Sequence, residues 1–128
     1  MDARRTKYLK LNDIEAYRIS FTLSNFVWDV IKEWGYFSKK TIGAQFVDAV
    51  DSISANIAEG FGRYTKKDKI RFYRINFASM YESLDWNEKA KVRKLLSDDD
   101  YNHIFNELQK LPNSINSLIN YTDSKLKL

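Results

Sequence analysis

Two glutamates and one histidine are the side chains of this sequence best suited to catalysis. Glu59 and Glu82 can be imagined as an acid and a base, since proton transfer needs positioned titratable groups. His103 is the only histidine and cysteine is absent, so a nucleophilic triad would depend on one residue. Asp100 and His103 have the spacing of a helical metal pair, but a di-metal bundle needs that pattern twice. We therefore expect no enzyme, metal or cofactor, and a surface or boundary position for His103.

The positions of the two glutamates favour a structural role. Glu59 precedes Arg63 by four residues, and Arg71 shares a helical row with Glu82. Carboxylates placed in this way accept paired hydrogen bonds from guanidinium groups, which fix helix register or subunit geometry. We therefore predict a structural or assembly network formed by Ser52, Asn56, Glu59, Arg71, Ser79 and Glu82.

These side chains require a helix, and the segment from Ile42 to Arg63 predicts one. Its apolar residues recur at steps of three or four, which places them on one helical face: Ile42, Phe46, Ala49, Ile53 and Ile57. A polar stripe follows the same steps on another side: Ser52, Asn56, Glu59 and Arg63. Gly60 and Gly62 are expected to stop the helix, because glycine tolerates the left-handed conformation at a helix end.

A basic segment interleaved with aromatic residues follows this helix. Residues 60–75 contain six lysines and arginines and one aspartate, although the net charge of the whole chain is only +4. Such a segment can neutralise phosphates and stack on exposed bases. The alternative is an ordinary solvated helix face. The residues predicted to contact nucleic acid are Arg63, Lys66, Lys67, Lys69 and Arg74.

Four helical segments are expected along the chain. The first follows Asn12 or Asp13 and ends at Gly35, and the second runs from about Thr41 to Glu59 after a turn at residues 35–40. The third opens at Thr65-x-x-Asp68, a variant capping box, and the fourth is capped by Ser97-x-x-Asp100, with acidic residues that suit the positive end of its dipole. Because short turns join antiparallel neighbours, we predict an all-α, up-and-down antiparallel four-helix bundle. Pro112 should kink the fourth helix near Leu108, or break it with a short restart.

Each expected helix has an apolar face. In the first helix two rows are predicted inward: Ile14, Tyr17, Phe21, Trp28 and Ile31 beside Leu23, Val27, Val30 and Trp34. In the third they are Ile70, Tyr73, Phe77, Met80, Tyr81 and Leu84, continuing toward Val92 and Leu95. In the fourth they keep one phase across Pro112: Tyr101, Ile104, Phe105, Leu108, Leu111, Ile115, Leu118 and Ile119.

Composition indicates a single folded domain. The chain has 128 residues, of which 44% are hydrophobic, with one proline and four glycines. We expect a basic flexible arm at residues 1–11, the bundle at 12–122 and a C-terminal tail at 123–128. The lack of cysteine fits a reducing compartment, and no segment approaches the roughly 20 apolar residues of a membrane span. A cytoplasmic protein without a membrane partner is therefore expected.

One group of residues matches a family signature. Residues 56–63, Asn-Ile-Ala-Glu-Gly-Phe-Gly-Arg, are preceded by Ser52 and followed by Arg71-Phe72 and Ser79-x-x-Glu82. This pattern resembles the four-helix-bundle family of the 23S rRNA intervening-sequence protein. The recognisable motifs lie in residues 42–84, with Ala78 where relatives often carry glycine.

The resemblance implies a ring-like homo-oligomer, often a pentamer. It also implies kinship with accessory proteins of diversity-generating retroelements, which bind nucleic acid and a reverse transcriptase. A ring would repeat the basic segment in every subunit, and avidity would strengthen its binding to RNA or DNA. The leading hypothesis is therefore a non-enzymatic oligomer that binds nucleic acid. The alternative is a scaffold that docks a protein partner such as a reverse transcriptase, without direct nucleic-acid binding.

Overall fold

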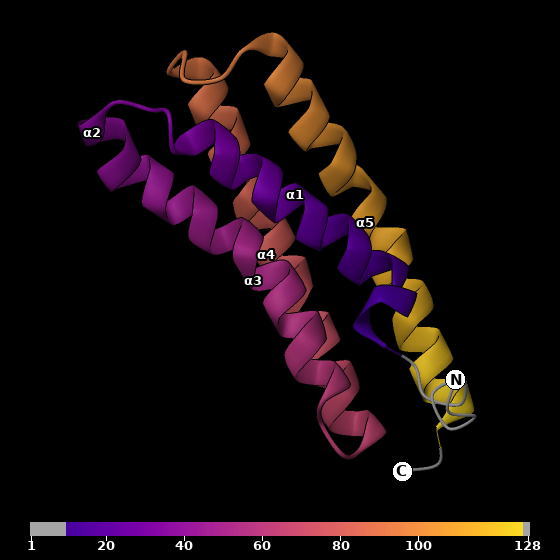
Figure 1. The fold of residues 1–128 in the computed structure, drawn as a ribbon. Coiled ribbons are helices and arrows are strands. Elements are labelled where there is room, and N and C mark those ends of the chain that lie inside the picture. Colours follow the sequence, from indigo (N-terminus) through magenta and orange to yellow (C-terminus); the bar gives the residue numbers. More distant parts are fainter. Residues whose placement is uncertain (1–9, 127–128) are drawn as a thin grey trace, which may run out of the picture.

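The computed structural model describes residues 10–126, and all of its regular elements are helical (Figure 1). A 3₁₀ turn, η2 (Leu11–Asp13), leads into the first long helix, α1 (Glu15–Ile31). The second long helical segment has three parts: α2 (Tyr36–Ser38), the π-helical η3 (Lys39–Gly43) and α3 (Ala44–Phe61). The last two helices are α4 (Lys66–Val92) and α5 (Asp98–Lys125).

The long helices form an antiparallel bundle in which α3 packs between α1 and α4, and α5 packs between α4 and α1. This arrangement confirms the predicted all-α four-helix bundle. The turn between α3 and α4 lies at the same end of the bundle as the last turn of α5 (Figure 1). The turns between α1 and α2 and between α4 and α5 lie at the opposite end.

The core is built from one apolar face of each long helix. The predicted row of the second helix is buried at all five positions, from Ile42 to Ile57. The predicted row of α5 supplies Ile104, Leu108, Leu111, Ile115 and Ile119 to the same cluster. Burying one such side chain stabilises a fold by about 1.5–3 kcal/mol, so these rows hold the bundle together.

The first helix is less deeply packed than its pattern predicted. Leu23, Val27 and Ile31 are buried as expected, but Phe21 is 50% exposed and Trp28 is 56% exposed. The apolar stripe of α1 is wider than the bundle can cover, because among the long helices between residues 10 and 126 it is mainly α3 and α5 that lie against it. The prediction that Phe21 and Trp28 point into the core is therefore wrong.

The second helical segment begins earlier than predicted. Helical structure starts at Tyr36, after Gly35 as N-cap, so residues 36–40 are not part of a turn. A π-helical segment from Lys39 to Gly43 joins α2 to α3. A Cβ on Gly43 would lie 2.9 Å from Cγ2 of Ile31, so this glycine allows the segment to approach α1 closely.

The inward face of α4 contains polar residues that the apolar pattern missed. Asn76, Ser83 and Asn87 are fully buried, whereas Tyr81 is 72% exposed and Val92 is 78% exposed. The prediction that Tyr81 and Val92 point inward is therefore wrong. The buried face of α4 includes polar residues, so it could not be traced from the apolar residues alone.

Two local features shape the ends of α4 and α5. After α4, Lys94 has φ of 60° and the Leu95 amide donates to Ala90 O at 2.8 Å, which closes the helix end.

α5 is continuous through Pro112, so the alternative of a break with a restart is wrong. α5 extends to Lys125, three residues into the segment expected as a tail, and most of the expected basic arm lies outside the described residues.

Between residues 10 and 126, none of the helices combines the length and the apolar character that crossing a membrane requires.

Candidate nucleic-acid interface

The basic segment begins at the turn between α3 and α4. α3 continues through Gly60 and ends at Phe61, and Gly62, its C-cap, has φ of −80°. No glycine between residues 10 and 126 has a positive φ, so the left-handed conformation expected of Gly60 and Gly62 is wrong. A Cβ on Gly60 would lie 2.8 Å from Cε1 of Tyr73 on α4. Gly60 therefore allows α3 and α4 to approach closely, before the chain turns at Gly62.

Lys69 closes the end of α3. Its Nζ donates to the backbone oxygen of Phe61 at 2.6 Å and lies 5.4 Å from the centroid of the Phe61 ring. The final carbonyl groups of a helix lack partners within the helix and carry partial negative charge, so a lysine there is stabilising. Partial burial lowers the pKa of Lys69 by desolvation. This predicted nucleic-acid contact thus already has a partner within the fold.

Arg63 is held at the surface by two side chains. Its Nη2 lies 2.9 Å from Oε2 of Glu59, the pair that the spacing predicted. The guanidinium carbon also lies 4.4 Å from the centroid of the Phe72 ring, and that of Arg71 lies 5.2 Å from the same ring. The Arg63 side chain nevertheless remains 42% exposed, so it lies at the surface in spite of both contacts.

The remaining predicted contacts surround a pocket between α4 and α5. Lys66, Lys67 and Arg74 line it, and its volume is about 270 Å³. Ile70 and Ile119 supply apolar walls, and α5 adds polar groups from Asn120 and Asp123.

The three cations of this pocket are not equally available. Nζ of Lys66 donates to the backbone oxygen of Asp123 at 3.1 Å and lies 3.7 Å from its carboxylate. Lys67 and Arg74 are exposed and form no ion pair with any residue between 10 and 126. Two exposed cations beside an amide side chain can bind a phosphate group. The sequence pattern missed Asn120 and Asp123, because they lie about 50 residues further along the chain.

The predicted structural network is divided among local contacts. Oγ of Ser52 donates to Asp48 O at 2.7 Å, and Oε2 of Glu82 accepts from Nε1 of Trp86 at 3.1 Å. Arg71 lies 3.4 Å from Asp68, and the backbone oxygen of Ser79 accepts from Ser83 at 2.8 Å. These contacts stay within single helices. Within the described part of one chain, the six residues do not form one hydrogen-bonded network.

Asn56 is the member of this group that reaches another helix. Its Nδ2 donates to Oδ1 of Asn76 on α4 at 3.1 Å. Asn76 is fully buried and was missed because it interrupts an apolar row. The signal that could have identified it is spacing, since Tyr73, Asn76 and Met80 follow each other at steps of three and four.

Other candidates for chemistry do not converge on a site. His103 is exposed, as expected, and its ring centroid lies 4.4 Å from that of Phe26. Glu59 and Glu82 are exposed and have different partners. Among the residues that the structure describes, no three histidine, cysteine or acidic side chains are grouped so that they could hold a metal ion.

Comparison with protein families gives a match over most of the chain. The family model of the 23S rRNA-intervening sequence protein matches residues 12–117, which include α1, α3, α4 and most of α5. The chain belongs to this family. The motif residues that carry the resemblance, from Ser52 to Glu82, lie within the matched range, on α3, on α4 and in the turn between them.

A solved structure supports the fold of the family. A crystal structure of a protein with unknown function from the S23 ribosomal protein family of Bacteroides thetaiotaomicron is similar, with a TM-score of 0.71 and 19% identity. The similarity covers 81% of this chain and 97% of that one. At this identity the likeness concerns the fold alone. No curated protein matches the chain.

Proposed function

We propose that this protein is a non-enzymatic homo-oligomer that binds RNA or DNA through the end of the bundle where α3 turns into α4. The observation that carries the proposal is the pair Lys67 and Arg74, which are exposed beside a pocket and have no acidic partner among residues 10–126. Arg63 and Lys66 add partly engaged cations at the same end. Contacts to phosphate are independent of sequence, so the expected binding is salt-dependent and tolerant of sequence.

Flat side chains at this end extend what the cations can bind. Tyr64, in the turn, is 79% exposed, and the guanidinium groups of Arg63 and Arg71 lie over the partly buried Phe72 ring. Aromatic and guanidinium planes can stack on unpaired bases. Single strands and loops are therefore the preferred form of nucleic acid in this proposal.

Assembly is the second part of the proposal, and the solvent-facing sides of α3 and α4 favour it. Ile75 is 44% exposed and Tyr81 is 72% exposed, and the small residues Ala55 and Ala78 are exposed on the same two helices. Small side chains let helices of neighbouring subunits approach closely. The family signature lies on this pair of helices, so we assign the subunit contact to it, with a pentamer as the favoured assembly.

Binding is tested by fluorescence anisotropy with labelled single-stranded RNA, single-stranded DNA and an RNA hairpin, each of about 20 nucleotides. The expected result is saturable binding at about 50 mM salt that weakens steeply toward about 200 mM. Absence of binding to all three probes at the lower salt concentration would refute the nucleic-acid function. A protein pull-down that survives high salt and nuclease would then favour the scaffold alternative.

Assembly is tested by light scattering coupled to size-exclusion chromatography. The wild-type chain is expected to elute as one oligomer, and Ala78→Arg to elute as a smaller species with unchanged helical circular dichroism. His103→Arg, on the exposed side of α5, is the control and should leave the oligomer size unchanged. A monomeric wild-type protein would contradict the assembly and remove the avidity argument.

A further inference from the structure

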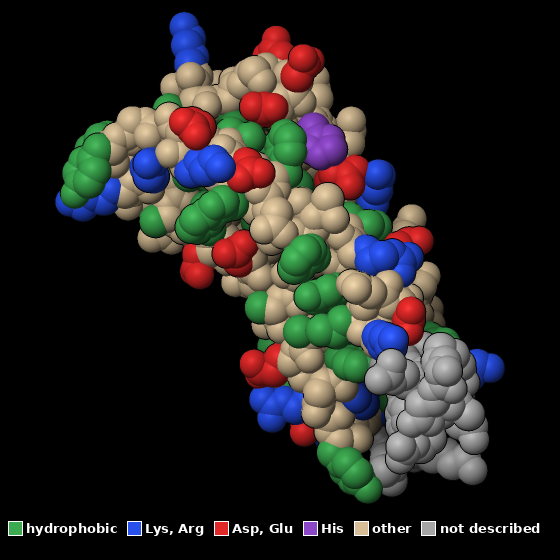
Figure 2. All heavy atoms as spheres, viewed as in Figure 1, with side chains coloured by type: hydrophobic (Ala, Val, Ile, Leu, Met, Phe, Trp, Pro, Cys, Tyr) green, Lys and Arg blue, Asp and Glu red, His purple; other side chains and the backbone are tan. Residues whose placement is uncertain are grey.

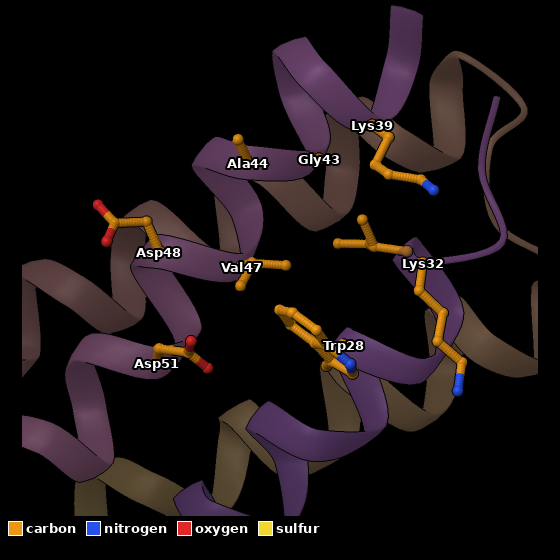
Figure 3. Close-up of a pocket in the computed structure, with 9 residues that line it drawn as sticks. Trp28, Lys32, Lys39, Gly43, Ala44, Val47, Asp48 and Asp51 are labelled. Carbon is orange, nitrogen blue, oxygen red and sulfur yellow. The ribbon is translucent and has the colours of Figure 1, made fainter. Parts of the chain in front are cut away.

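A groove between α1 and α3 lies apart from the basic end. Its volume is about 520 Å³, and its apolar walls are formed by Trp28, Ile31, Ala44 and Val47. Figure 3 shows the Trp28 ring turned toward Val47 across the groove. The π-helical segment η3 reaches the groove at Lys39 and Gly43, and such segments often mark functional positions in helices.

The apolar surface continues along α1 beyond the groove. Phe21 lies seven residues before Trp28, which places both on one side of the helix, and Tyr17 stacks on Phe21 with ring centroids 5.7 Å apart. Figure 2 shows hydrophobic side chains gathered along the middle of this face, over α1 and α3. A row of half-exposed aromatic residues beside a groove is typical of an interaction site.

The charges of the groove are divided between its two ends. Lys32 and Lys39 lie at one end and Asp48 and Asp51 at the other (Figure 3). Lys32 is already paired with Asp29, at 3.2 Å. Asp48 and Asp51 form no ion pair with a lysine or arginine between residues 10 and 126. The end near the two aspartates therefore carries negative charge that the described part of the chain does not balance.

Asp51 is the aspartate more closely associated with the groove. Its carboxylate is directed toward Trp28 in Figure 3. Desolvation by partial burial and the neighbouring Asp48 raise the pKa of Asp51, while a hydrogen bond from Ser24 opposes the rise. The positive charge of a cation bound beside Asp51 would favour the charged carboxylate and so oppose both causes of the rise, and a flat guanidinium could lie on the Trp28 indole.

We propose that this groove binds an amphipathic helix of a protein partner, with aliphatic side chains against Trp28 and Val47 and an arginine or lysine between Asp48 and Asp51. A helix is the fitting shape because the groove runs between two helices and offers apolar contacts along its length. The distance from Lys39, at the start of η3, to Asp51 on α3 corresponds to about 18 Å, or roughly three turns of a partner helix. This site is independent of the nucleic-acid interface.

The test uses the full chain and a synthetic helix as the probe. The probe is an alanine-rich peptide of about 15 residues. Its leucines recur at helical steps of four and three, and two arginines lie on the same face. Binding is followed by the indole N–H signals of the uniformly ¹⁵N-labelled protein, and the Trp28 signal is assigned by its loss in Trp28→Phe. The expected result is a saturable shift of the Trp28 signal, with smaller changes at Trp34 and Trp86.

Variants of the peptide and of the protein distinguish the proposed contacts from nonspecific hydrophobic binding. Replacing both arginines of the peptide by glutamine, or introducing Asp48→Asn with Asp51→Asn, should weaken binding by about three- to tenfold. Trp28→Ala, followed by the backbone amide signals of α1 and α3, should weaken it by about tenfold or more. Asp98→Asn with Asp99→Asn makes the same charge change at the first turn of α5 and should leave affinity unchanged.

Four results would overturn the proposal, and the first three concern the binding of the peptide. The first is that the Trp28 signal does not shift even at the highest soluble peptide concentration. The second is that the arginine and glutamine peptides bind with equal affinity. The third is that the two pairs of aspartate variants change the affinity equally. A fourth is a change of oligomer size in Asp48→Asn with Asp51→Asn, because a second copy of the chain would then cover the groove. Retained binding of RNA or DNA by these variants would show that the nucleic-acid interface stands separately.

Discussion

Asn56 on α3 and Asn76 on α4 form a direct side-chain hydrogen bond, with Nδ2 of Asn56 3.1 Å from Oδ1 of Asn76. Asn76 is fully buried, and its own Nδ2 has no partner among the described residues. We expect this buried polar contact to fix the register of α3 against α4, because a shift of either helix would break the hydrogen bond inside the core.

The two members of this pair should respond differently to substitution. Asn56→Ala leaves the buried amide of Asn76 without a partner and should lower the free energy of unfolding by about 1–3 kcal/mol. Asn76→Leu removes the buried amide and should be neutral or slightly stabilising. Urea denaturation measures both. Equal destabilisation by the two changes would contradict this account of the pair.

Gly60 and Gly62 should also differ. Gly60→Ala places a Cβ 2.8 Å from Cε1 of Tyr73 and 2.9 Å from Cβ of Phe72, so it should cost about 1–3 kcal/mol of unfolding free energy. Around Gly62 the nearest atoms would be 3.6 Å away and φ is −80°, so Gly62→Ala should be neutral or stabilising by up to about 1 kcal/mol. Thermal denaturation compares the two, and a tolerated Gly60→Ala would show that the helices can separate at little cost.

Lys69 should act on stability more than on binding. Lys69→Met removes the ammonium group that donates to Phe61 O, and it should lower the unfolding free energy by about 1 kcal/mol. Lys67→Met, two residues earlier and exposed, is the matched control and should leave stability unchanged. If Lys69→Met weakened nucleic-acid binding and left the free energy of unfolding at the wild-type value, Lys69 would instead be a contact residue.

Tyr73 predicts how stability changes in alkali. Burial raises the pKa of Tyr73 from 10.0 to about 12, because the phenolate is poorly solvated in the core. A folded-state pKa above the unfolded value means that the stability contribution is complete below pH 10 and is lost as pH rises toward 12. Tyr73→Phe should reduce this loss in urea unfolding measured across that range. An unchanged alkaline loss would assign it to other groups.

The fold was predictable because most helices bury regular apolar rows. The row from Ile42 to Ile57 and the row on both sides of Pro112 gave the correct phase of two helices. The prediction failed where burial did not follow hydrophobicity. Trp28 is exposed because no helix of the described residues covers it, and Asn76 is buried with Asn56 as its hydrogen-bond partner.

The candidate interface was predictable only in part. The cations lie close together in the sequence, directly after one predicted turn. The position of that turn was therefore enough to predict which end of the bundle carries them. The partners of individual cations are not local. Lys66 contacts Asp123, and Lys69 contacts a backbone oxygen, so neither contact could be derived from residue spacing. These contacts make Lys67 and Arg74 the better residues with which to test binding.

The most direct measurement of the central claim is the affinity and salt dependence of RNA binding after charge reversal at these two positions. Lys67→Glu with Arg74→Glu should weaken binding by about tenfold or more and reduce the slope of log affinity against log salt by about 2. Arg93→Glu with Lys94→Glu, directly after the far end of α4, makes an equal charge change as the control and should have a much smaller effect. If the two double variants lose affinity equally, or if neither does, the end of the bundle between α3 and α4 is not the nucleic-acid interface.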